Sequence, residues 1–105
     1  MSANLKSSAD YVRLLLTSSR KQARLLIKHA DTKQIDALCE IGVNLLTLSV
    51  PVKVKRLIQK CKKYLKKLGK KHLSSKGKLR IILSHLGAFI SILIAIRPIL
   101  LEILQ

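Results

Sequence analysis

Apolar residues recur at steps of three and four along most of the chain, and no stretch alternates with a period of two. This spacing places apolar side chains on one face of a helix, so the pattern predicts an all-α protein. Before residue 51 it predicts helices over residues 8–17, 20–29 and 32–48. Each helix begins just after the first residue of a pair with capping-box spacing. The pairs are Ser7 with Asp10, Ser19 with Gln22, and Asp31 with Gln34. The third helix is apolar on several sides, which indicates the centre of the core.

Pro51 separates these helices from a basic segment and an apolar one. A basic amphipathic helix is predicted from Val52 to Leu68, with an apolar stripe of Val54, Leu57, Ile58, Cys61, Tyr64, Leu65 and Leu68. The last helix begins near Gly77 behind a Ser74 or Ser75 cap and continues to Leu104. We expect it to pack on Leu38, Leu45 and Leu46 of the third helix. The predicted fold is a small bundle of four to five helices with a basic amphipathic helix and an apolar C-terminal helix.

Charge divides the chain into three zones within one compact unit. An N-terminal helical part, residues 1–50, carries seven basic and four acidic side chains. Residues 51–80, a lysine-rich helix and linker, carry thirteen basic side chains and no acidic one. The apolar C-terminal helix, residues 81–105, holds one of each sign. Nearly all of the net charge of +16 therefore lies in the middle zone.

The sequence offers little to a catalytic site. His29, His72 and His85 lie far apart, and no histidine is four residues from another histidine or a cysteine. Cys39 and Cys61 fall at apolar helical positions, so we expect reduced core residues and no metal site. No glycine-rich phosphate loop occurs. We therefore expect a protein that is not an enzyme and needs no cofactor.

The middle zone predicts a polyanion partner, because thirteen cations with no acid to balance them would repel one another. Lysine outnumbers arginine there by eleven to two, which suits contacts to phosphates better than bidentate reading of bases. Tryptophan is absent and aromatic residues are few, so no stacking platform for single strands is evident. We expect sequence-independent binding and condensation of double-stranded DNA. The candidate DNA-binding residues are Lys53, Lys55, Arg56, Lys60, Lys62, Lys63, Lys66, Lys67, Lys70, Lys71, Lys76, Lys78 and Arg80.

Two alternatives stay open. In the first, the basic helix lies on an anionic membrane surface and the tail enters the acyl region, although Ile81 to Ile96 is short for a bilayer span. In the second, the apolar tails associate in a structural homo-oligomer. The polar stretch Met1 to Asp10 shows no secretory signal, so we expect an intracellular or virion-enclosed protein, with membrane association as the alternative.

Three segments in order, KQARLLIKHADTKQIDALCEIGVNLL, VPVKVKRLIQKCKKYLKKLGKK and LGAFISILI, carry a family resemblance. Together they resemble the small basic protein of adintoviruses and Maverick/Polinton elements, which is likened to the adenovirus core protein X (mu). The shared marks include Ala37, Cys39, Glu40 and Asn44, and the resemblance covers about residues 20 to 95. It implies a core protein on packaged double-stranded DNA, in the virion and the host nucleus. That family's tail opens with Gly-Gly and contains prolines, whereas this chain has Leu86-Gly87 and only Pro98, so we expect a more regular helical tail.

Overall fold

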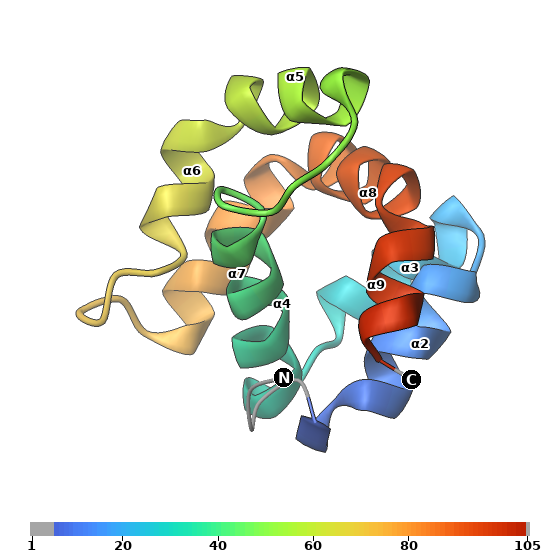
Figure 1. Ribbon diagram of the computed structural model, residues 1–105. Coiled ribbons are helices and arrows are strands. Elements are labelled where there is room, and N and C mark those ends of the chain that lie inside the picture. The colour runs from blue at the N-terminus through green and yellow to red at the C-terminus, as the bar shows by residue number, and fades with distance from the viewer. Residues whose placement is uncertain (1–5, 105) are drawn as a thin grey trace.

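The computed structural model describes residues 6–104, which form eight helices and no strand (Figure 1). Residues 1–5 of the polar N-terminal stretch and Gln105 lie outside this range. The all-α class is confirmed, but the predicted count of four to five helices is too low. The helices are α2 (Ala9–Thr17), α3 (Arg20–Lys28), α4 (Thr32–Asn44), α5 (Val52–Lys60), α6 (Lys62–Lys67), α7 (Ser75–Ser84), α8 (Leu86–Ala95) and α9 (Arg97–Ile103).

The predicted caps at Ser19 and Asp31 are confirmed, and of these two only Asp31 forms a full capping box. Asp31 and Gln34 form the full capping box of α4, with bonds of 2.8 and 2.9 Å. Ser19 accepts the Gln22 amide at the start of α3. The structure places the start of α2 one residue later than predicted, after Ser8, whose side chain makes no cap bond. Ser8 Oγ instead donates to the backbone oxygen of Lys33 at 3.5 Å, which links α2 to α4.

The third helix ends four residues earlier than predicted, at Asn44. Residues 45–50 leave the helix, and Leu45, Leu46, Leu48 and Val50 line a small cavity with Ile58 of α5. Apolar side chains that would have continued the helical pattern thus cover the next helix instead.

The basic helix and the tail are each broken where one helix was expected. Cys61 separates α5 from α6, and its backbone lies in the bridge region with φ −101° and ψ 3°. His85 separates α7 from α8, which meet at 85°. Ile96 separates α8 from α9, because Pro98 lacks an amide hydrogen and its ring would clash with the carbonyl of residue 94. The expectation of one regular tail helix is therefore wrong.

Size explains why the tail bends. A straight helix over residues 75–104 would be about 45 Å long at 1.5 Å per residue. The longest dimension of the described chain is 32 Å. The three shorter helices instead wrap the core: α7 packs on α4, α8 on α3 and α5, and α9 on α2 (Figure 1).

The core is centred on α4, as predicted. Ile35, Ala37, Leu38, Cys39 and Ile41 are buried along it. At Gly42 the helix lies close to its neighbours, because a Cβ atom there would lie 2.9 Å from Leu68, the C-cap of α6, and 3.7 Å from Phe89 of α8. The predicted pairing of the third helix with the tail is confirmed through α7, which packs against α4.

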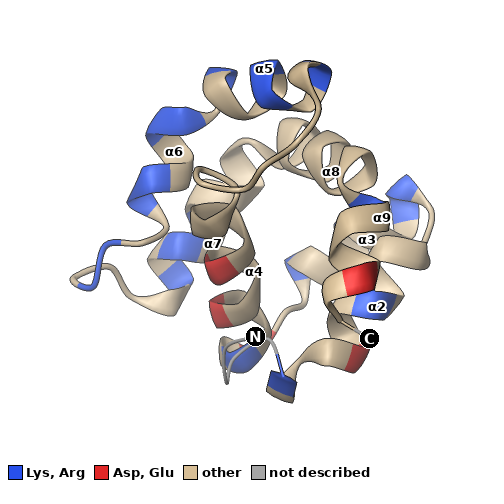
Figure 2. Cartoon of the chain, viewed as in Figure 1, with Lys and Arg blue, Asp and Glu red and all other residues tan. Residues whose placement is uncertain are grey.

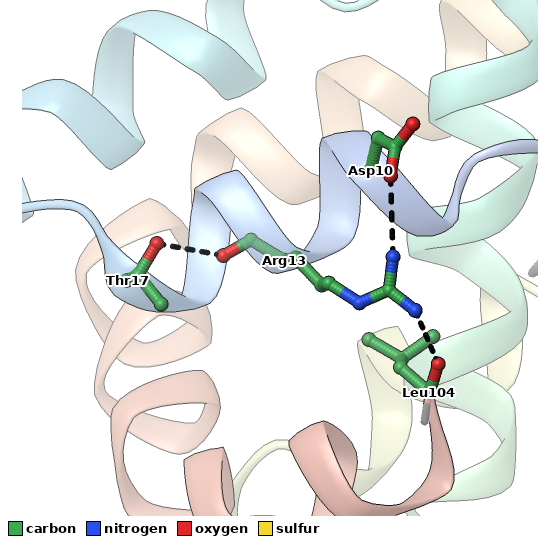
Figure 3. Close-up of polar contacts among 4 residues, drawn as sticks. All are labelled: Asp10, Arg13, Thr17 and Leu104. Carbon is green, nitrogen blue, oxygen red and sulfur yellow. Dashed lines mark hydrogen bonds and ion pairs between the residues drawn. The ribbon is translucent and has the colours of Figure 1, made fainter.

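A polar contact fixes the end of the tail. The Arg13 guanidinium lies between the Asp10 carboxylate and the backbone of Leu104 (Figure 3). Its Nη1 is 3.1 Å from Asp10 Oδ1, and its Nη2 donates to the Leu104 oxygen. Thr17 Oγ1 donates to the Arg13 oxygen one turn further along α2. These bonds hold the C-terminal end of α9 against α2.

Candidate nucleic-acid interface

The two basic helices bury an apolar side and expose their lysines. Val54 and Ile58 of α5, Cys61 at the break, and Tyr64, Leu65 and Leu68 are at most 7% exposed. This is the predicted stripe except for Leu57, which is 37% exposed on the outer side of α5. Burial of the stripe fixes the rotation of both helices, so their charged side chains point into solvent.

Twelve of the thirteen candidate DNA-binding side chains are exposed, and we call these twelve the main cationic face. Blue segments follow α5, α6, the turn after α6 and α7 along one edge of the molecule (Figure 2). Because α6 packs against α7, cations distant in sequence share this edge. The main cationic face consists of Lys53, Lys55, Arg56, Lys60, Lys62, Lys63, Lys66, Lys67, Lys70, Lys71, Lys76 and Arg80.

Lys78 is the member of the predicted set that the fold turns partly inward. It is half-buried on α7, close to α4. Burial raises the pKa of the Cys39 thiol to about 11, while the charge of Lys78 lowers that pKa and the charge of Asp36 raises it. Lys78 therefore faces groups of α4 and is a poor candidate for phosphate contact.

No acid neutralises the main cationic face within the described chain. Between residues 6 and 104 the only ion pair joins Arg13 to Asp10, on α2. Red segments lie on α2, α4 and α9, and none lies on α5 or α6 (Figure 2). The Asp36 carboxylate accepts a bond from Ser75 at 3.4 Å, beside the N-terminus of α7. The fold therefore keeps the carboxylates away from most of the lysines.

An aromatic stack joins α6 to the junction of α7 and α8. The rings of Tyr64 and His85 lie 4.2 Å apart with an interplanar angle of 14°. Tyr64 is buried, and burial raises the pKa of its hydroxyl. His85 is the residue at which α7 turns into α8, so the stack ties the basic helix to the bend of the tail. Ser74 caps α7 through the Gly77 amide at 3.1 Å, as predicted.

A concave region of about 750 Å³ lies elsewhere, between α2 and α3. Its lining includes Tyr11, Leu25 and Leu26, and its exposed leucines are Leu14 (54%) and Leu25 (50%). Tyr11 donates to the Leu26 oxygen at 2.9 Å, and this bond joins the two helices beside the groove. The sequence pattern did not indicate this groove, because both leucines follow the helical apolar spacing of buried residues.

Within residues 6–104, no single helix is long and apolar enough to cross a membrane, whereas α7 and α8 would suffice only as a pair, across their 85° bend. Comparison with protein families, curated proteins and solved structures finds no match to this chain.

Proposed function

We propose that this chain is a non-enzymatic protein that binds double-stranded DNA through its main cationic face, independently of sequence. The observation that supports this most directly is the continuous edge of twelve exposed cations without an ion-pair partner among residues 6–104. Phosphate contacts along such an edge would release counterions from the duplex and relieve the repulsion between lysines. The resemblance to the adintovirus and Polinton core protein supports a role on packaged DNA, in the virion and the host nucleus.

The size of the molecule sets the number of contacts. A duplex segment as long as the 32 Å dimension of the chain carries about 19 phosphate charges, of which roughly half face one side. The main cationic face therefore has enough charge for about six to nine simultaneous phosphate contacts. The logarithm of the affinity should then fall with the logarithm of the salt concentration with a slope of about −5 to −8.

Fluorescence anisotropy with two unrelated duplexes tests this proposal. We expect equal affinities, and a loss of about a thousandfold or more between about 0.05 and 0.2 M salt. Anionic liposomes titrated in parallel report on the membrane alternative. Binding that survives about 0.5 M salt, strong discrimination between duplexes, or tighter binding to liposomes than to DNA would contradict the proposal.

Charge reversal of α6 locates the binding. Lys62, Lys63, Lys66 and Lys67 are all exposed, so replacing them with glutamate should leave the helix content unchanged and nearly abolish DNA binding. The matched control replaces the same four residues with arginine, which keeps the charge and should keep the affinity. Circular dichroism of both variants verifies the fold. Unchanged binding by the glutamate variant would place the contacts elsewhere.

A further inference from the structure

The helix α3 carries four cations and no acid, outside the zone that dominates the net charge. Its Ala23 and Ile27 are buried against the core, which turns the opposite side outward. Lys21, Arg24 and Lys28 lie on that outer side and are exposed. None of the three forms an ion pair within the described chain. Arg20, at the edge of this side, donates to Ser91 Oγ of α8 at 3.2 Å and helps to fix α3 in place. We call Lys21, Arg24 and Lys28 the second cationic face.

The fold directs the first turn of α3 away from α6, while α3 also packs against α7, which carries Lys76 and Arg80 of the main cationic face. The apolar helix α8 packs against both α5 and α3 and lies between them (Figure 1). Blue segments at the first turn of α3 lie at the edge of the molecule opposite to α6 (Figure 2). A duplex on the main cationic face would therefore leave the first half of α3 in solvent.

Distance weakens the electrostatic coupling between α6 and the first turn of α3, which lie at opposite edges of the molecule (Figure 2). The smallest dimension of the described chain is 27 Å. The Debye length at physiological ionic strength is about 8 Å, so phosphates bound at one edge scarcely screen charges at the other. After one duplex has bound, the second cationic face keeps its attraction for a polyanion.

We propose that the second cationic face binds a second duplex, so that one molecule bridges two DNA segments. This inference rests on the proposed function and adds a mechanism of condensation to it. Phosphate is the ligand, as at the main cationic face, but fewer contacts make the second site weaker. Bridging is more sensitive to salt than the binding of one duplex, because it adds the phosphate contacts of both faces.

Bridging has one competing mechanism, in which two copies of the chain pair and each holds one duplex. The apolar groove between α2 and α3, with the exposed Leu14 and Leu25, is the surface on which such pairing would depend. Repulsion between two chains of net charge +16 opposes it. The experiment must therefore distinguish the contribution of the α3 cations to bridging from that of the groove leucines.

A capture assay does so. A biotinylated duplex is held on beads, and the retention of a fluorescent duplex by added protein is measured at about 0.1 M salt. The variant Lys21→Gln/Arg24→Gln should retain about tenfold less fluorescent duplex, while its anisotropy affinity for one duplex changes by less than about threefold. Lysine, arginine and glutamine have similar helix propensities, so α3 itself should persist.

The matched control is Lys6→Gln/Lys33→Gln, which removes the same charge from exposed positions outside both faces and should leave capture unchanged. If this control loses as much capture as the α3 variant, the effect depends on net charge alone and the inference is overturned. Loss of capture in Leu14→Gln/Leu25→Gln, with capture intact in the α3 variant, would assign bridging to paired copies and also overturn it. If the unmodified protein binds no duplex by anisotropy, the proposed function itself fails. If it binds one duplex but the α3 variant captures normally, only the bridging inference fails.

Discussion

Replacing Ile92 with aspartate tests whether the apolar tail belongs to the core of a single molecule. Ile92 lies in α8 and is 1% exposed. Removing a buried isoleucine side chain costs about 2–5 kcal/mol. A carboxylate without a partner in that place adds several kcal/mol more, or takes up a proton at similar cost. The sum is comparable to the whole free energy of unfolding of a small domain, about 5–15 kcal/mol.

The expected result is loss of most helical circular dichroism at 25 °C, or a urea midpoint close to zero. Ile103→Asp is the matched control, because Ile103 belongs to the same tail but is 43% exposed. The urea midpoint of Ile103→Asp should correspond to a change of at most about 1 kcal/mol in the free energy of unfolding.

Two other outcomes would refute the reasoning, and each corresponds to one alternative for the tail. If the parent chain sediments as an oligomer and Ile92→Asp sediments as a folded monomer, the tail is an interface between copies. If Ile92→Asp stays fully helical at unchanged mass and loses liposome binding, the tail serves a membrane. Circular dichroism, sedimentation and liposome flotation on the same two variants therefore separate the three possibilities.

Two further predictions concern the core around α4. Gly42→Ala should destabilise the protein by about 1 kcal/mol in urea unfolding, because its Cβ would lie 2.9 Å from Leu68 and the strain exceeds the gain in helix propensity. Gly87→Ala, with no atom within 4 Å of the new Cβ, should be neutral or stabilising. A Gly87→Ala variant less stable than Gly42→Ala would contradict the close packing of α4 with α6. Burial raises the pKa of Cys39 from 9.0 to about 11, so the unfolded chain loses this proton first as the pH rises. Relative to Cys39→Ala, the free energy of unfolding of the parent chain should fall by about 2 kcal/mol between pH 9 and 11 and stay constant below pH 9. Parallel profiles of unfolding free energy against pH for the two proteins would exclude a buried thiol at residue 39.

The sequence predicted the helical class, the caps at Asp31 and Ser74, and the central place of α4, because these depend on spacing within a few residues. It did not predict the breaks at Cys61 and His85. Neither residue is a proline or glycine, so no local signal marks the bend. The break at His85 follows from the size of the molecule, because a straight helix over residues 75–104 would be about 45 Å long and the longest dimension of the described chain is 32 Å, which is a property of the whole chain.

The main cationic face was predictable for a similar reason, and the second cationic face was not. Lysines at α5 and α6 alternate with apolar positions at helical spacing, which fixes their exposure once the stripe is buried. The cations of α3 fall in a zone whose net charge is only +3, because the acids of α2 and α4 offset them in the sum. In the fold, Asp10 faces Arg13 and Asp36 faces Ser75, so neither neutralises Lys21 or Arg24. Charge summed along a sequence therefore hid a surface that becomes visible only in the fold.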